Sequence, residues 1–256
     1  MNLLFWSWNV NGLRAALNKG FIDIIKKEQP DILGIQETKL QEHQIPEELK
    51  TLDEYLIYWS HGLRKGYSGT GLFTKLLPLK FSTGFGYQEF DCEGRINIAE
   101  YDAFIYFNIY FPNGQKDDER LNYKLRFYDR CLEVMEEKRA TGKIILVGGD
   151  FNTAHKPIDL ANPKENEKTS GFLPIERAWL DKLETMGWID TFRYFDKSPD
   201  QYSWWSFRTK ARLRNVGWRL DYFWVNSESM KYVKKAGIRQ DIDGSDHCPV
   251  FVELVI

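Results

Sequence analysis

The sequence predicts an α/β or α+β fold in one domain that spans residues 1–256. Short apolar runs alternate with helical patterns along the whole chain, and no repeat, low-complexity tract or Pro/Gly-rich linker divides it. With 43% hydrophobic residues, a chain of 256 residues can bury a large core. The pattern alone leaves the topology open.

Six apolar runs are expected to be strands, because they are rich in β-branched and aromatic residues. Several are apolar on both faces, as in a sheet that is covered by helices or by a second sheet. The runs are residues 3–9, 31–37, 104–111, 143–149, 220–226 and 249–255.

Three segments carry apolar residues at helical spacing. The first covers 13–25 and stops before Pro30, and the second covers 121–135. The third begins at Pro174, a favoured first-turn position, and ends at Gly187. The residues of this third helix that we expect to point inward are Ile175, Trp179, Leu183 and Met186.

Composition bounds the environment of the protein. The net charge of −2 predicts no nucleic-acid partner by itself, so any DNA contact requires a local basic surface. Three scattered cysteines form neither a disulfide framework nor a zinc spacing. The N-terminus lacks a signal-peptide pattern, and no apolar stretch is long enough to cross a bilayer. We expect a cytoplasmic monomer, nucleoid-associated in a prokaryote, with no membrane partner.

Polar residues gather at the ends of the expected strands. They are Asn9, Glu37, Tyr110, Asp150, Asn152, Asp221, Asp246 and His247. Strand ends meet at one rim of a sheet, where ligand sites form in layered folds. Carboxylates gathered there would repel one another unless a cation lay between them, and oxygen ligands suit Mg²⁺ or Mn²⁺ rather than zinc.

Each of these residues taken alone has a structural explanation. Asn9 could cap a helix, Asp150 could belong to a turn, and Tyr110 could be a core tyrosine. The occurrence of the whole set at strand ends favours a functional site.

Residues 201–220 combine basic and aromatic side chains without any acidic residue. The basic residues are Arg208, Lys210, Arg212, Arg214 and Arg219, and the aromatic ones are Tyr202, Trp204, Trp205, Phe207 and Trp218. A charged segment is often a solvated face, and tryptophans are often part of a core, but basic groups interleaved with aromatic ones suit a phosphate backbone and an unstacked nucleotide, and we favour that interpretation. The glycine-rich segment 64–69 is a weaker candidate for contact with phosphates.

Seven motifs together resemble the exonuclease III family of AP endonucleases in order and spacing. They are WNVNGLRA (8–15), IQETK (35–39), KGYSGTGL (65–72), YFPNG (110–114), GDFNTA (149–154), NVGWRLDYF (215–223) and GSDHCP (244–249). The resemblance covers essentially the whole chain. GDFN and SDH alone would also fit other members of the endonuclease/exonuclease/phosphatase superfamily, including those that hydrolyse inositol phosphates.

The resemblance implies a four-layer α/β sandwich in which two mixed β-sheets stack and helices flank them. It also implies Mg²⁺ as the cofactor, with Mn²⁺ as a substitute and Glu37 as the principal ligand. The residues implied for the metal region are Asn9, Glu37, Asp150, Asn152, Asp246 and His247.

The resemblance further implies catalytic roles. Asp150 would orient and deprotonate the attacking water. Asn9, Asn152 and a protonated His247 would donate to the phosphate oxygens, and Asp221 would hold His247 in its charged form. Tyr110 would either hydrogen-bond the phosphate or assist the nucleophile as a phenolate.

The implied substrate is double-stranded DNA that contains abasic sites or blocked 3′ ends. Cleavage 5′ to an abasic site would leave a 3′-hydroxyl and a 5′-deoxyribose phosphate, and 3′–5′ exonuclease and 3′-end trimming would use the same chemistry. Backbone contacts are implied for Arg14, Tyr67, Asn113, Lys116 and Arg208. A pocket for the flipped-out sugar is implied for Trp204, Trp218 and Leu220.

Three positions depart from the animal branch of the family. Asn11 stands where that branch has aspartate, Lys116 where it has arginine, and Arg208 where it has methionine.

Two other functions are weighed against the nuclease: a phosphoesterase of the same superfamily with a non-DNA phosphodiester or phosphomonoester substrate, and a DNA-binding module without catalysis. The basic and aromatic segment argues against the first, and the intact polar set argues against the second.

Overall fold

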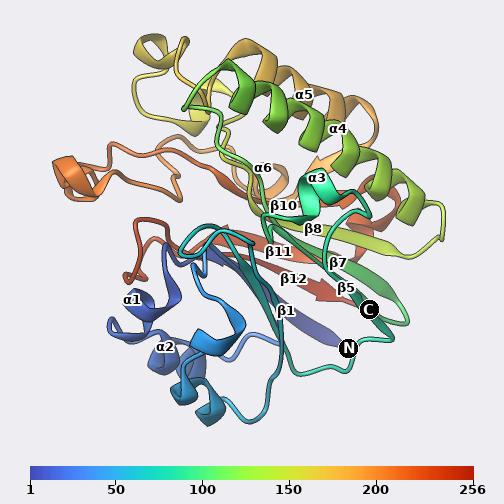
Figure 1. Cartoon of the computed structure of the whole chain (residues 1–256). Helices are drawn as coiled ribbons and strands as arrows, with labels where there is room; N and C mark the ends of the chain where they lie inside the picture. The colour runs from blue at the N-terminus through green and yellow to red at the C-terminus, as the bar shows by residue number, and fades with distance from the viewer.

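The computed structural model describes residues 1–256 apart from the side chain of Thr209. Two six-stranded mixed sheets face each other, with helices on their outer faces (Figure 1). The first sheet has the order β11 (Val233–Ile238), β12 (Val250–Val255), β1 (Asn2–Asn9), β2 (Ile32–Gln36), β4 (Thr70–Thr74) and β3 (Leu56–Ser60). The second has the order β5 (Lys80–Ser82), β6 (Ile96–Glu100), β7 (Phe104–Tyr110), β8 (Ile144–Asp150), β10 (Asp221–Asn226) and β9 (Trp188–Asp190). The predicted four-layer α/β sandwich is confirmed.

Helices form the two outer layers (Figure 1). The first sheet is covered by α1 (Leu13–Leu17) and α2 (Phe21–Glu28), and the second by α4 (Asp118–Arg139) and α5 (Pro174–Thr185). Two short helices are α3 (Gln88–Asp91) and α6 (Thr191–Phe195). The 3₁₀ turns are η1 (Glu42–Gln44), η2 (Glu47–Thr51), η3 (Pro157–Asp159), η4 (Lys164–Asn166), η5 (Phe207–Thr209), η6 (Ala211–Arg214) and η7 (Ser227–Tyr232).

The alternation of side chains along the strands builds three layers of core. In β8, Ile145 and Val147 pack outward against α4 and α5, whereas Leu146 faces the opposite sheet. In β1, Phe5 faces the opposite sheet and Trp8 packs outward against α2. Because successive strand residues point to opposite faces, a strand buried on both sides has to be apolar throughout.

The inner faces change from apolar to polar toward one end of the sandwich. In β1 the inward positions run from Phe5 to Asn9, and in β8 they run from Leu146 to Asp150. Strand β7 is parallel to β8 and ends beside it, with Tyr110 opposite Asp150. Strand β10 is antiparallel to β8, so its first residue, Asp221, also lies opposite Asp150. The strand ends therefore bring these polar side chains to one rim.

The predicted helices differ from the observed ones in two details. The segment 13–25 divides into α1 and α2 at Gly20, whose φ of 88° suits glycine in particular. In α5, Ile175 and Met186 are exposed, while Glu176 and Leu180 are buried in their place. The buried face follows the i, i+3, i+4, i+7 series from Glu176 to Leu183, and this series leaves Ile175 and Met186 at its edges.

The two chain ends lie close together, and Ile256 donates its backbone N–H to the carbonyl oxygen of Met1 at 2.9 Å (Figure 1).

Among the described residues, no helix combines the length and the hydrophobicity that crossing a membrane requires. Six strands, β3, β4, β5, β6, β9 and β11, were not among the expected runs; β5 and β9 have three residues each, and β11 carries two lysines.

Candidate active site

A cavity of about 440 Å³ opens at the rim where the polar strand ends meet. Side chains from both sheets and from the loops around them line it. The lining residues are Glu37, Tyr110, Asn113, Gln115, Asn152, Asn166, Thr169, Ser170, Gly171, Trp204, Ser206, Ala211, Val216, Trp218, Leu220, Asp246 and His247. The floor is thus polar, and one wall is apolar and aromatic.

Asn9 connects the acidic residues of the two sheets. Its Nδ2 donates to Glu37 Oε1 at 2.9 Å and to Asp150 Oδ2 at 2.8 Å. Burial acts to raise the pKa of Glu37, but Lys39, which lies 3.0 Å from the carboxylate, and the Asn9 amide outweigh it and lower that pKa. Glu37 is therefore an ionised carboxylate on the cavity wall.

Asp150 is buried beside Asn152 and His247, which line the cavity. Its Oδ1 accepts the backbone N–H of Asn152 at 2.8 Å, and its Oδ2 accepts the Asn152 side-chain amide at 3.2 Å. Asn152 adopts a left-handed backbone with φ 51°, which turns its side chain back toward the carboxylate. Burial raises the pKa of Asp150 to about 7, even though the charge of His247 acts to lower it. This carboxyl can exchange a proton near neutral pH.

His247 is buried between two carboxylates. Its Nδ1 lies 2.8 Å from Asp221 Oδ2, and its Nε2 lies 3.9 Å from Asp150 Oδ2. Asp221 is held in turn by the hydroxyl of Ser203, which donates at 2.6 Å. Burial acts to lower the pKa of His247, but Asp221 and Asp150 outweigh it and raise that pKa to about 10. The imidazole is therefore a cation at neutral pH.

Asp246 and Tyr110 complete the rim. The Asp246 carboxylate accepts from Asn11 Nδ2 at 3.0 Å and from Trp204 Nε1 at 3.1 Å. Burial acts to raise the pKa of Asp246, but His247 and these donors lower it. Burial and the charge of Glu37 raise the pKa of Tyr110 well above its ordinary value. The surroundings of Tyr110 thus favour a hydrogen-bonding phenol over a phenolate.

Two groups of side chains in the site have the chemistry to hold a metal ion. Ligand atoms of Asp150, Asp221 and His247 all lie within 4.8 Å of one another. An ion on His247 would require the imidazole to release a proton, because Nδ1 is already occupied by Asp221 and the pKa of the ring is raised. Glu37 and Asp246 instead present ionised carboxylates to the open cavity, and such hard oxygen donors fit a divalent cation without any proton loss.

The residues expected to contact DNA fall into three places. Trp204, Trp218 and Leu220 form the apolar wall, with the two indole rings edge to face at a centroid distance of 6.4 Å. Asn113 lies where the cavity continues into a neighbouring groove of about 640 Å³, which Tyr67 and Lys116 also line. Arg14 in α1 and Arg208 in η5 are exposed and lie outside the lining of both hollows.

The interpretation of residues 201–220 as one exposed basic surface is wrong for part of the segment. Arg219 is buried, and its guanidinium binds Asp159 at 2.8 Å and Asp190 at 2.7 Å. Trp205 is also buried, beneath the guanidinium of Arg212. A guanidinium with buried acidic partners elsewhere in the chain looks the same in sequence as a solvated one.

Several residues near the site were not singled out from the sequence. Ser203 holds Asp221, and Lys39 pairs with Glu37. Tyr67 accepts hydrogen bonds from Arg95 and Arg120, each at 2.9 Å. Proximity in sequence was the available signal for Ser203 and Lys39, which adjoin recognised positions, whereas Arg95 and Arg120 come from distant segments.

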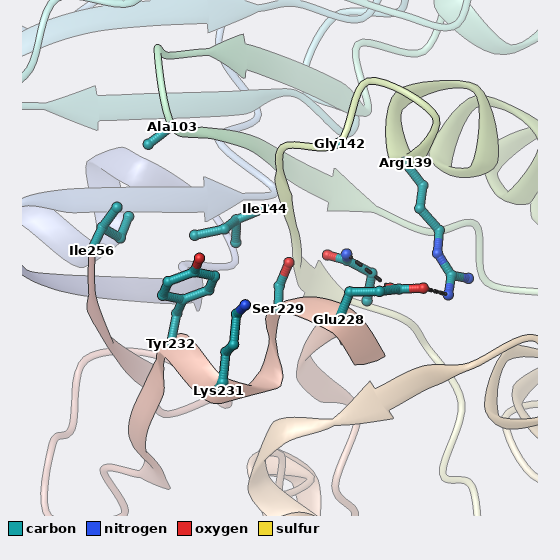
Figure 2. A pocket seen from close by; sticks show the side chains of 10 residues that line it. Ala103, Arg139, Gly142, Ile144, Glu228, Ser229, Lys231, Tyr232 and Ile256 are labelled. Atoms are coloured by element: carbon teal, nitrogen blue, oxygen red, sulfur yellow. Dashed lines mark hydrogen bonds and ion pairs between the residues drawn. The ribbon is translucent and has the colours of Figure 1, made fainter.

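A second hollow of about 360 Å³ lies at the opposite end of β8, beside the C-terminus. Figure 2 shows Ile144 from the start of β8 among its lining residues, with Tyr232 and Ile256 nearby. Arg139 also lines this hollow, and its guanidinium forms an ion pair with Glu228 (Figure 2). None of the polar residues gathered at the other rim lines this hollow, so the catalytic candidate is the cavity at that rim.

The fold and the site define the class of protein. The chain matches the model of the Endonuclease/Exonuclease/phosphatase family over residues 6–247, and it belongs to this family. Within the family it is a hydrolase of the AP endonuclease and exodeoxyribonuclease type, which confirms the resemblance found in the sequence motifs.

Relatives and solved structures agree with this assignment. The chain is 41% identical to the exodeoxyribonuclease of Bacillus subtilis, with 98% of both chains covered. It is 39% identical to the DNA-(apurinic or apyrimidinic site) endonuclease of Dictyostelium discoideum, over 96% of this chain and 69% of that protein. The structure of an AP endonuclease from Archaeoglobus fulgidus superposes with a TM-score of 0.89 at 25% identity, over 99% of this chain and 100% of that one.

Proposed function

We propose that this protein is a Mg²⁺-dependent DNA-repair phosphodiesterase that cuts the backbone 5′ to abasic sites. The products are a 3′-hydroxyl and a 5′-deoxyribose phosphate, and the same site removes nucleotides and blocking groups from the 3′ ends of duplex DNA. The observation that carries this proposal is the position of Asp150, a buried carboxyl with a pKa of about 7 that lies 3.9 Å from the cationic His247 of the apolar-walled cavity.

The proposed chemistry starts at Asp150. A general base works best when its pKa is near the working pH, so this carboxylate is suited to take a proton from the attacking water. As the water oxygen bonds to phosphorus and the bond to the 3′-oxygen breaks, negative charge grows on the non-bridging oxygens. The imidazolium of His247 would donate Nε2–H to these oxygens, and the amides of Asn9 and Asn152 would do so by exchanging a bond to a carboxylate for one to the phosphate. Asp221 positions His247, and Tyr110 donates its hydroxyl to the phosphate.

Glu37 and Asp246 would hold the metal, with Asn9 beside them and Asp150 and Asn152 at a second or alternative position. When bound, Mg²⁺ would neutralise charge on the phosphate and help the 3′-oxygen to leave. Mn²⁺ would substitute because it accepts the same oxygen ligands.

The apolar wall explains the proposed preference for abasic sites. Trp204, Trp218 and Leu220 suit a deoxyribose that carries no base, and extrusion of such a sugar breaks no base pair. Backbone contacts are proposed for Asn113, Tyr67 and Lys116 in the adjoining groove. Arg14 and Arg208, both exposed, are proposed to reach the flanking phosphates.

The remaining proposals concern the whole chain. Residues 1–256 would form a single catalytic domain that works as a monomer. The substrate would be double-stranded DNA in the cytoplasm, or in the nucleoid of a prokaryotic cell.

The test uses a labelled duplex with one tetrahydrofuran residue as the abasic analogue. With Mg²⁺ we expect a single nick 5′ to the analogue and a 3′-hydroxyl that a polymerase can extend, and with EDTA we expect no nick. A nick that persists in EDTA would contradict the metal assignment. Hydrolysis of phosphoinositides or bis(p-nitrophenyl) phosphate without any nicking of this duplex would favour the non-DNA phosphoesterase instead.

A further inference from the structure

A buried ion pair lies behind the wall of the catalytic cavity. Lys124 of α4 and Glu176 of α5 are both fully buried, and Lys124 Nζ lies 2.7 Å from Glu176 Oε1. Replacing such a pair with apolar residues often stabilises a protein, so folding stability alone gives weak reason to keep it. Its other contacts indicate what it does.

The Lys124 ammonium reaches the turn that carries Asn152. It donates to the Asn152 carbonyl at 2.8 Å and to Thr153 Oγ1 at 2.8 Å. These two bonds, with the bond to Glu176, use all three donors of the ammonium. Because Asn152 has a left-handed backbone, this turn needs tertiary contacts to hold it.

The Glu176 carboxylate holds the opposite wall. It accepts the backbone N–H of Gly171 at 2.6 Å and of Leu173 at 3.1 Å, and the Ser170 hydroxyl at 2.9 Å. Ser170 and Gly171 both line the cavity. A methyl group added at Gly171, where φ is 98°, would lie 3.3 Å from the Trp218 ring, so the wall stands directly against the indole.

We infer that Lys124 and Glu176 are a positioning pair, which fixes the cavity wall at Ser170 and Gly171 relative to the phosphate-facing turn at Asn152. The pair thereby determines which residue of the DNA fits the cavity while the phosphate of that residue is cleaved. This inference rests on the proposed function. The pair touches no reacting atom. It joins one group that stabilises the transition state to one wall that selects the substrate, so a small shift in the pair disturbs both.

The test compares Lys124→Met and Glu176→Gln with wild type on two duplexes, one with a tetrahydrofuran residue and one with a normal nucleotide at the same position. We expect kcat on the tetrahydrofuran duplex to fall at least tenfold while its Kd changes less than threefold. We also expect the ratio of incision at tetrahydrofuran to incision at the normal nucleotide to fall at least fivefold, because a loosened wall admits larger residues.

Two further variants separate positioning from general stability. Lys138 lies on the same helix as Lys124 but well away from the cavity, and Lys138→Met removes its ion pair with Glu100. In this variant, kcat and the incision ratio should stay at the wild-type level. Lys124→Arg keeps a buried cation with several donors and should recover at least half of the wild-type kcat. Should Lys124→Met fail to fold, Ser170→Ala removes a single hydrogen bond to Glu176, and it should still lower both the ratio and kcat severalfold.

The outcomes distinguish the inference from the function on which it rests. A wild-type protein that does not nick the tetrahydrofuran duplex would overturn the proposed function. A wild type that nicks it, with folded Lys124→Met and Glu176→Gln variants that keep the wild-type kcat and ratio, would overturn the positioning pair alone. An equal loss in Lys138→Met would also overturn it, since the effect would then follow stability.

Discussion

Arg219 and Asp221 are separated by one residue, yet they belong to two clusters of buried charge with opposite properties. Around Arg219, two carboxylates meet two guanidiniums, and each acid has a basic partner within 2.8 Å. Burial acts to raise the pKa of Asp159, but Arg219 and Arg193 outweigh it and lower that pKa well below the ordinary range. This structural cluster, formed by Asp159, Asp190, Arg193 and Arg219, is complete by itself.

The cluster that contains Asp221 has an excess of acid. Among the described residues, its four carboxylates have two cations in direct contact or close to them, and the pKa of Asp150 rises to about 7 because these cations do not fully compensate burial. The members of this catalytic cluster are Glu37, Asp150, Asp221 and Asp246, with Lys39 and His247 as the cations.

The difference teaches how to separate structural from functional charge in one fold. Buried charges that serve stability are matched, because an unmatched buried charge is unfavourable. Unmatched carboxylates persist where a substrate or a cation completes the set, and such sites commonly reduce stability in exchange for activity. Mutations in the catalytic cluster should therefore reduce activity more than stability, and mutations in the structural cluster should reduce stability more than activity.

The largest expected effect is that of Asp150→Asn, which removes the proposed general base. We expect kcat to fall by roughly a hundredfold or more with little change in DNA affinity, given the size of general-base effects. The folded-state pKa of Asp150 lies above its unfolded value of about 4, so its ionisation destabilises the metal-free fold as the pH rises toward 7. Asn should therefore raise the Tm of the metal-free protein at pH 8. A loss of DNA binding or of stability would instead make Asp150 a structural residue.

Asp159→Asn should produce the converse result in the structural cluster. The variant removes one of the two carboxylates that bind Arg219, which should lower the free energy of unfolding by about 3–5 kcal/mol. The value of kcat should change only slightly. A lowered carboxyl pKa contributes stability that is present above the unfolded pKa and lost as the pH falls below it. In urea unfolding, the gap between wild type and variant should therefore shrink below about pH 4. A gap that widens in acid would contradict the assignment.

The smallest expected effect concerns the alkaline limb of the pH profile. Burial lowers the pKa of His247, and Asp221 is the strongest group that raises it to about 10. Activity that needs the imidazolium should decline as the pH rises through that value. Asp221→Asn should move the decline to lower pH by roughly one unit or more, equivalent to about 1.4 kcal/mol. Profiles of kcat between pH 7 and pH 11 measure this shift, and an unmoved alkaline limb would mean that another group controls it.

Much of the fold and of the candidate site could be predicted because the informative residues are local in sequence. The six expected apolar runs all became strands, and Asn9, Tyr110 and Asp150 end strands whose parallel or antiparallel pairing brings them to one rim. The short strands β5 and β9 could not be predicted, since three residues give too little periodicity to distinguish a strand from a loop.

Long-range contacts decided the rest. The sequence by itself determined which residue types stand at the strand ends, because alternation along each strand is a property of its own backbone. Only the tertiary structure decided that Arg219 is a buried partner of Asp159 while Leu213 and Arg214 in the same segment are exposed, and that His247 is charged. The charge and exposure of these groups depend on side chains far away in sequence, such as Asp150, which lies 97 residues before His247. The electrostatic energy of a buried group is set by its distance in space from such side chains.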